Sequence, residues 1–410
     1  MLHIKPIFAA LLRNRIAAGV IALQIALTLA IIANCAYLVS NRISDMSRPS
    51  GLDEANVFTV AVSSLARSES AANDLERDLA AIRAMPGVED ATAINSLPLS
   101  GGGWSFSFST SLEKAQSGRD EDGEGAAVYF VDEHGLAATG VALSRGRFFS
   151  PEEVSILQEQ GDPQPEVIVI SDFLAERLFP DEDPLGKPIW SGTDADRPAP
   201  VVIGTVAQLQ SPWTSWGQTN SAALLPVKFA QQSRDYVIRT QPGLRAEVMG
   251  EIEKALADVD NNRIIHEVRG FDEIRERGYR NQNAMAWILV ATMIALALVT
   301  SLGIVGMASF WVTQRTKQIG TRRALGARQF DVRSHFQVEN GLISAMGVVL
   351  GVLMAYGLNI WLVSSLGLPS LPVWYLPIMA VVVFILGQIS VLGPARRASK
   401  VSPAVATRTV

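Results

Sequence analysis

The run IAAGVIALQIALTLAIIANCAYLV at residues 16–39, 24 residues without a charge, decides what kind of fold this chain adopts. Three further uncharged apolar runs lie toward the other end of the chain, at residues 284–312, 341–363 and about 373–392. Each is long enough to cross a hydrocarbon layer of about 30 Å, because an α-helix rises about 1.5 Å per residue. The sequence therefore predicts one membrane-spanning helix, a large polar segment, and then three more spanning helices.

Two other interpretations of the first run are a cleaved signal peptide and a lipoprotein signal ending at Cys35. The run is longer than the usual apolar core of a signal peptide, about 7–15 residues. Asn34 fits poorly just before a modified cysteine. We therefore interpret this run as a helix that stays in the protein.

The charges are divided unequally between the two sides of these runs. The chain has 410 residues, 48% of them hydrophobic and 18% charged, with a net charge of −5. The two ends and the segment between the second and third runs carry 13 basic residues and two acidic ones, a net charge of +11. The remaining 22 basic and 38 acidic residues give −16. Because basic residues favour the cytoplasmic side, both termini are predicted inside and the large polar segment outside.

This orientation divides the chain into nine predicted segments. They are a cytoplasmic N-terminus (1–15), a first transmembrane helix (16–41), an outer domain (42–283), a second transmembrane helix (284–312), a cytoplasmic coupling loop (313–340), a third transmembrane helix (341–363), an outer loop (364–372), a fourth transmembrane helix (373–393) and a cytoplasmic tail (394–410). Gly347 and Gly351 in the third helix form a GxxxG pattern, which allows a close helix–helix contact.

The outer domain is predicted to contain two β-α-β halves separated by a β-rich insertion at about residues 100–215. Alternating residues indicate strands, and apolar residues at helical spacing indicate the helices between them. The predicted elements are strands at 56–63 and 88–97 around a helix at 71–85, and strands at 236–240 and 263–268 around a helix at 244–259. The insertion has strand candidates at 126–131, 166–170 and 200–206. The charged segment 271–283 is predicted to continue the second span outward as a helical stalk. The predicted fold is thus an α+β membrane protein with split β-α-β halves.

The sequence contains no recognisable catalytic or metal-binding constellation. The four histidines are scattered, Cys35 is the single cysteine, and the Gly-rich stretches at 101–103 and 186–188 lack the rest of a phosphate-binding loop. The four apolar runs contain no Asp, Glu, Lys, Arg or His, which argues against a proton- or sodium-driven carrier. We therefore expect no catalytic residue, no metal, no cofactor of its own and no nucleic-acid partner.

The segment between the second and third runs is unusual in composition. It reads RTKQIGTRRALGAR at residues 315–328, with Asp331 and Glu339 following. A basic segment beside the membrane would explain its charges. It would not explain the glycines and alanines, which suit a short helix lying flat against a partner.

This segment resembles the cytoplasmic loop of the FtsX/MacB-type ABC transporter permeases, in which a Gly-x-x-Arg-Ala-Leu-Gly-Ala sequence precedes a hydrophobic span that opens near a Glu. The end of the chain, PARRAS at 394–399 with Pro403 and Ala404 following, is similar to the closing sequence of these permeases. Pieces similar to the MacB-like periplasmic core domain occur in order at 85–88, 97–101, 146–149, 167–179 and 183–189. The resemblance covers nearly the whole chain.

The resemblance implies a bacterial inner-membrane protein with a periplasmic core of two subdomains, four membrane helices and cytoplasmic termini. It implies a dimer of permeases, identical or paralogous, served by ATP-binding subunits that bind the ATP. About 15 residues precede the first span, so the ATPase is expected in a separate protein. The residues expected to contact it are Gly320, Arg322, Arg323, Ala324, Leu325, Gly326 and Ala327.

Two classes of function are compatible with this resemblance. The first is a permease whose periplasmic domain is moved by ATP-driven closure of its partner and exports or releases a substrate, with lipoprotein release as one variant. A periplasmic membrane-fusion protein would be a further partner in export. The second is a transmembrane regulator that controls a periplasmic enzyme by the same movement. A stand-alone enzyme is the least favoured reading.

Overall fold

The computed structural model describes residues 15–65, 71–117, 119, 122–157, 164–191 and 199–401. They form two compact units, one of Arg48–Asn281 and one of the residues before and after it. We name these the outer unit and the membrane unit. Residues 1–14 of the predicted N-terminal segment and 402–410 of the predicted tail, with Pro403 and Ala404, lie outside the described residues.

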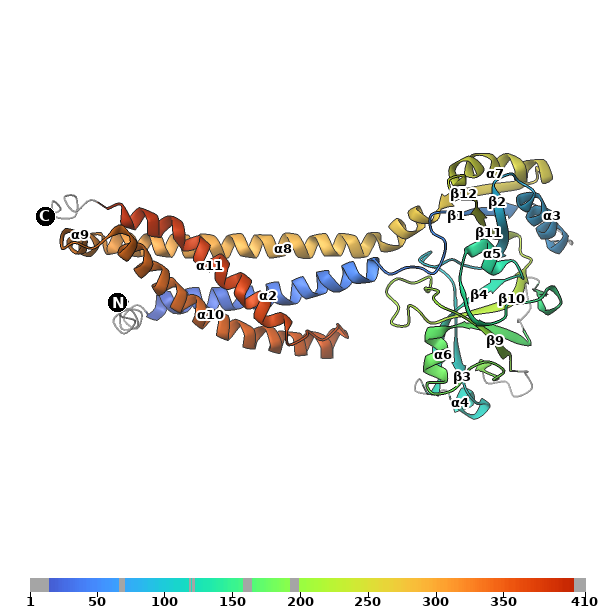
Figure 1. The fold of residues 1–410 in the computed structure, drawn as a ribbon, viewed down its shortest axis with the longest axis horizontal. Coiled ribbons are helices and arrows are strands. Elements are labelled where there is room, and N and C mark those ends of the chain that lie inside the picture. The colour runs from blue at the N-terminus through green and yellow to red at the C-terminus, as the bar shows by residue number, and fades with distance from the viewer. Residues whose placement is uncertain are drawn as a thin grey trace. The chain divides into compact units, whose positions relative to one another are not determined.

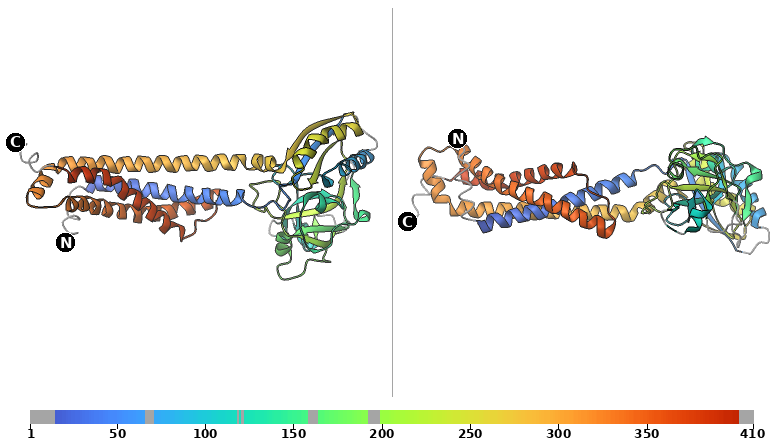
Figure 2. Two further views of the ribbon diagram at one scale, coloured as in Figure 1. Left: turned by 45° about the horizontal axis from the view of Figure 1, so that its top comes forward. Right: turned by 90° about the horizontal axis from the view of Figure 1, so that it is seen from below.

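The membrane unit contains four helices that are long and apolar enough to cross a membrane, counted among the described residues. Each of them contains one of the four uncharged runs, and Figure 2 shows them lying side by side. They are α2 (Arg15–Met46), α8 (Phe271–Gln314, in this unit from Gln282), α10 (Gln329–Leu366) and α11 (Tyr375–Ser399).

Helix α2 is the most enclosed of the four. Of its most apolar stretch 56% is buried, against 11% for α8. Thr28 Oγ1 lies 2.6 Å from Thr300 Oγ1 of α8, and Asn34 Nδ2 donates to the Ala355 carbonyl of α10 at 3.2 Å. Such bonds between helices are worth roughly 0.6–2 kcal/mol in a membrane. Apolar packing and these bonds together hold α2 against both neighbours.

The predicted helical stalk at 271–283 is part of α8, which is uninterrupted from Phe271 to Gln314. Gly278 does not break the helix. A Cβ at this position would lie 2.5 Å from the Leu99 carbonyl oxygen. The glycine therefore allows the chain at Leu99 to approach the helix closely.

The first sheet of the outer unit has four antiparallel strands in the order β12-β1-β11-β2. Two helices cover one face of this sheet, where Phe58, Val60 and Ile238 pack with Leu79 and Ile252 (Figure 1). Strand β11 separates β1 from β2, so the two β-α-β halves interleave, as the split motif requires. The elements are β1 (Val57–Ser64), α3 (Ala71–Arg83), β2 (Val88–Ile94), β11 (Ser233–Thr240), α7 (Arg245–Val259) and β12 (Arg263–Gly270).

The second sheet follows the path β5-β9-β7-β10-β4-β3-β8, with β6 beside β10, and mixes parallel and antiparallel pairs. Its core joins the apolar faces of the central strands to α6. The elements are β3 (Trp104–Ser109), α4 (Leu112–Ser117), β4 (Glu124–Val131), α5 (Gly135–Thr139), β5 (Leu143–Gly146), η2 (Pro151–Glu153), β6 (Ser155–Leu157), β7 (Val167–Ser171), α6 (Asp172–Leu178), β8 (Trp190–Ser191), β9 (Val201–Val206) and β10 (Ala222–Phe229).

The structure confirms the fold class and extends the insertion. The predicted insertion, about residues 100–215, stops before β10, yet β10 pairs with β4, β6 and β7 inside the second sheet. The inserted subdomain therefore runs to Phe229. Strand pairing depends on distant partners, so an apolar run at 222–227 does not reveal which sheet it joins.

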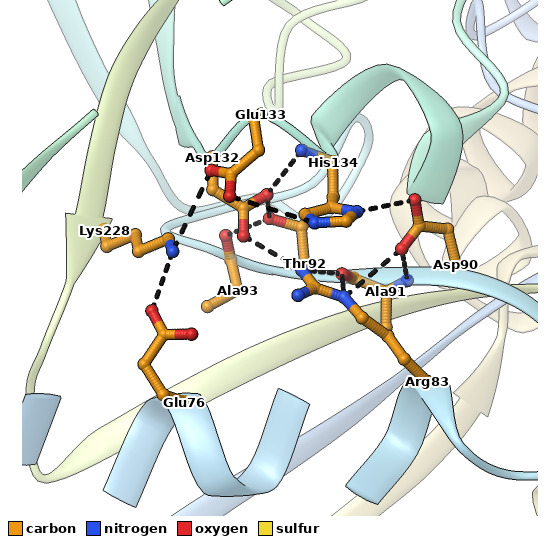
Figure 3. Close-up of polar contacts among 10 residues, drawn as sticks. All are labelled: Glu76, Arg83, Asp90, Ala91, Thr92, Ala93, Asp132, Glu133, His134 and Lys228. Atoms are coloured by element: carbon orange, nitrogen blue, oxygen red, sulfur yellow. Dashed lines mark hydrogen bonds and ion pairs between the residues drawn. The ribbon is translucent and has the colours of Figure 1, made fainter. Parts of the chain in front are cut away.

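A network of charged groups joins the two sheets of the outer unit (Figure 3). The buried carboxylate of Asp132, 1% exposed, accepts from Thr92 Oγ1 at 2.7 Å and from Arg83 Nη2 at 3.0 Å. His134 Nδ1 lies 2.9 Å from Asp90 Oδ2. Because Asp132 and His134 follow β4, whereas Arg83 belongs to α3 and Asp90 and Thr92 to β2, these contacts connect the inserted subdomain to the first sheet.

Candidate functional site

The candidate site is the connection between α8 and α10 in the membrane unit, residues 315–330. It contains a short helix, α9 (Thr316–Ala324), as the sequence suggested. The helix ends in two overlapping bonds: Gly326 N–H donates to the Arg323 carbonyl and Ala327 N–H to the Arg322 carbonyl, both at 3.1 Å. This pair defines a Schellman motif.

Gly326 makes that ending possible. Its φ of +100° is in the left-handed region, which residues with a Cβ adopt only at a cost of roughly 1–2 kcal/mol. The chain then enters α10 at once, and Asp331 Oδ2 accepts from the Arg328 N–H at 2.9 Å. The sequence Ala-Leu-Gly-Ala-Arg thus encodes a sharp turn between two helices.

The inner side of α9 packs on the beginning of α10 and the end of α11. Ile319 joins Val332, Phe336, Ala395 and Ala398 in a small apolar cluster. Gly320 is buried beside Ile319. Helix α9 is therefore held in place by apolar packing, although it is only nine residues long.

Arg323 ties α9 to the end of α11. Its Nη1 donates to the carbonyl oxygens of Ser399 at 3.0 Å and Val401 at 2.8 Å. The last carbonyl groups of a helix have no partner within the helix, so a cation there satisfies them and interacts favourably with the helix dipole. The sequence PARRAS at 394–399, at the end of α11, is thus the segment that α9 contacts.

A buried ion pair lies just behind this site. Arg315 Nη1 contacts both carboxylate oxygens of Glu339, at 3.0 and 2.9 Å, and the Glu339 side chain is 2% exposed. Removing one partner of such a pair leaves an uncompensated buried charge, which typically costs about 3–5 kcal/mol. The pair connects the residue that follows α8 with α10.

The outer side of the connection presents two large apolar side chains. Leu325 is 83% exposed and Phe330 is 72% exposed. Four of the predicted contact residues, Arg322, Ala324, Leu325 and Gly326, are exposed, whereas Gly320 is buried and Arg323 and Ala327 are half-buried. We name Arg322, Ala324, Leu325, Gly326 and Phe330 the coupling surface.

Sequence reasoning missed two features of this site. Phe330 was not among the predicted residues, although an aromatic residue in the first turn after a basic loop is a visible signal. The Arg315–Glu339 pair was missed because its partners are far apart in the sequence.

The glycines of the GxxxG pattern face α2. A Cβ on Gly347 would lie 2.8 Å from the Ala22 carbonyl oxygen, and one on Gly351 would lie 3.0 Å from Ala26 Cα. Both distances are shorter than ordinary contact. The two glycines therefore lie where α10 and α2 approach most closely.

Among the described residues, no group of three or more His, Cys, Asp or Glu side chains is placed to hold a metal ion.

Two family models match the chain. The MacB-like periplasmic core domain matches residues 16–255, and the C-terminal domain of FtsX-like permeases matches residues 290–403. The chain belongs to the MacB/FtsX-type ABC permease family. The matched ranges cover most of the outer unit and most of the four membrane helices of this permease, so it is a membrane protein with a large domain outside the membrane.

Curated relatives are similar over part of their length. The permease is 29% identical to a macrolide export ATP-binding/permease protein MacB of Chromobacterium violaceum, over 68% of this chain and 42% of that protein. It is 27% identical to a probable export ATP-binding/permease protein of Pseudomonas fluorescens, over 50% of this chain and 32% of that protein. The chain thus spans less than half the length of these relatives.

Solved structures of outer domains are also similar. The periplasmic region of MacB from Actinobacillus actinomycetemcomitans is 14% identical, with a TM-score of 0.34, over 57% of this chain and 97% of that one. The extracellular domain of the transporter YknZ from Gram-positive bacteria is 15% identical, with a TM-score of 0.31, over 51% of this chain and 100% of that one.

Proposed function

We propose that this chain is the permease subunit of an ATP-driven transporter in the bacterial inner membrane. In this proposal a separate ATP-binding subunit docks on the coupling surface and hydrolyses the ATP. The permease transmits the resulting movement to its periplasmic domain, which exports or releases a substrate. The chain itself carries out no chemical step.

The exposed side chains of Leu325 and Phe330 carry the proposal. Fully burying one large apolar side chain is worth about 1.5–3 kcal/mol. Leu325 is 83% exposed, so a partner that covered it would gain most of this, roughly tenfold or more in affinity. An apolar pair on a basic connection between membrane helices is suited to a groove on a soluble partner.

The contacts beneath the coupling surface support a role in transmission. Ile319, the Arg323 bonds to α11 and the Arg315–Glu339 pair connect this surface to α10 and α11. A force applied at Leu325 therefore reaches two membrane helices through buried contacts rather than through a loose loop.

Charge and exposure support the proposed surroundings. The net charge of +11 on one side of the spans and −16 on the other favours cytoplasmic termini and a periplasmic outer unit. The small buried share of α8, 11%, leaves apolar surface for the lipid bilayer and for a second permease, identical or paralogous. A periplasmic membrane-fusion protein is a further proposed partner for export.

Co-purification tests the coupling surface. The ATP-binding subunit is first identified by mass spectrometry as the ATPase that copurifies with the full-length chain. We expect Leu325→Asp to reduce its recovery about tenfold, while Leu65→Asp, the same change at an exposed leucine of the outer unit, leaves recovery at the wild-type level. Recovery of the ATPase by the Leu325 variant at the wild-type level would refute the assignment.

A second experiment separates export from regulation of a periplasmic enzyme. The purified complex in lipid vesicles should move or release an amphiphile when ATP is supplied. A stable periplasmic enzyme partner, with no ATP-dependent movement of any tested amphiphile, would instead identify a regulator.

A further inference from the structure

A cleft of about 350 Å³ lies in the outer unit, between the face of the four-stranded sheet opposite α3 and α7 and the aromatic side chains of the second sheet. Asp235 and His266 line it on the side of β11 and β12. Trp104 of β3 and Phe229 of β10 line it on the other side. Its volume falls in the range of small-molecule sites, about 300–1,000 Å³.

The wall of the cleft at Trp104 is made of packed aromatic rings and is open to solvent. Trp104 is 43% exposed, yet its ring makes edge-on contacts with Phe130 and Phe229, with ring centroids 5.4 and 6.1 Å apart. Gly103 precedes it, and a Cβ there would lie 2.7 Å from Pro212 Cγ. Gly103 therefore allows the chain just before Trp104 to lie close to Pro212.

The opposite wall carries a carboxylate without a partner. Asp235 is exposed, and its side chain makes no hydrogen bond or ion pair with any other residue in the part of the chain that the structure describes, while its neighbours are engaged elsewhere. His266 Nε2 lies 2.8 Å from Ser63 Oγ, and Arg269 pairs with Glu267. Burial in the walls raises the pKa of Asp235, and the charges of Arg269 and His266 oppose that rise.

We propose that this cleft binds a small organic cation, a protonated amine that carries an apolar group. The ammonium would donate hydrogen bonds to Asp235, which charge makes stronger than neutral ones. The apolar group would lie against Trp104 and Phe229, where an indole face also attracts a cation. This site is independent of the coupling surface.

Binding of phenethylammonium to the full-length chain in lipid nanodiscs tests the proposal, measured by calorimetry. The neutral 2-phenylethanol serves as a ligand of nearly the same shape without the charge. Asp235→Asn removes the carboxylate charge, and Trp104→Leu removes the indole. Asp181→Asn, at an exposed carboxylate outside the cleft, is the matched control and also corrects for partition of the amine into lipid.

We expect phenethylammonium to bind the wild type and the Asp181 variant equally, and the Asp235 and Trp104 variants at least tenfold more weakly. 2-Phenylethanol should bind at least tenfold more weakly than the amine. Size-exclusion profiles and circular dichroism identify any variant that fails to fold. If the Asp235 or the Trp104 variant does not fold, the affinity of the other one tests the proposal. Equal affinity of the amine for all folded variants, or no binding to the wild type, would overturn the proposal.

Discussion

The contact between α10 and α2 leads to a sharp prediction about two glycines on the same helix. Gly347 faces α2, where a new Cβ would lie 2.8 Å from the Ala22 carbonyl oxygen and 2.9 Å from Ile25 Cβ. Gly357, less than three turns further along, has no atom within 4 Å of such a Cβ. The substitution Gly→Ala therefore tests the approach of the helices at one site and helix propensity alone at the other.

The two terms have opposite signs. Alanine favours a helix over glycine by up to about 1 kcal/mol, and this gain is present at both positions. At Gly347 the two helices must separate by several tenths of an ångström, and overpacking of this kind costs about 1–3 kcal/mol. We therefore expect Gly347→Ala to be less stable than Gly357→Ala by about 1–3 kcal/mol.

The chain supplies its own probe for the measurement. Cys35, its single cysteine, is half-buried on α2, so a thiol-reactive fluorophore reports the exposure of this helix during heating in detergent. Gly347→Ala should release the Cys35 thiol at a temperature several degrees below that of Gly357→Ala. If both variants released it at the same temperature, the two helices would not be in close contact at Gly347.

Two further predictions concern ion pairs. Arg315→Met should lower the free energy of unfolding of the membrane unit by about 3–5 kcal/mol by leaving Glu339, which is 2% exposed, buried and unpaired, and the additional change Glu339→Ala should recover part of that loss in the same thermal assay. In the outer unit, the hydrogen bonds from Arg147 lower the pKa of Glu153 from its ordinary value of 4.5 to about 2. A lowered folded-state pKa means that this pair stabilises fully above about pH 4.5 and loses its contribution as the pH falls toward 2. Hydrogen exchange around Glu153, measured relative to the intrinsic exchange rate at each pH, should accelerate as the pH falls from 4.5 toward 2.5 in the wild type, and Glu153→Gln should remove that local change.

The features that the sequence predicted well are those that depend on neighbouring residues. The uncharged runs and the helical period of α3 and α7 each follow from a few consecutive side chains. The resemblance at 315–328 also located the candidate site, although it did not distinguish the buried Gly320 from the exposed Leu325.

The features that the sequence did not predict depend on distant residues. Nothing near β10 indicates that it pairs with β4 and β7. Likewise, neither Arg315 nor Glu339 shows by itself that the other is its partner, and Asp235 looks like an ordinary strand residue until Trp104 is placed across from it. These contacts are decided by the packing of whole elements, which local periodicity does not describe.

The place where the inserted subdomain joins the first sheet has an evolutionary consequence. Ile94 at the end of β2 lies directly opposite Asp235 near the start of β11, so the chain leaves and re-enters the four-stranded sheet at one cross-strand pair. A short hairpin could close the same gap, and the entropy cost of a longer connection grows only with the logarithm of its length. The connection between β2 and β11 is therefore an insertion site. A whole subdomain could be gained, enlarged or exchanged there during evolution without altering the order of the four strands.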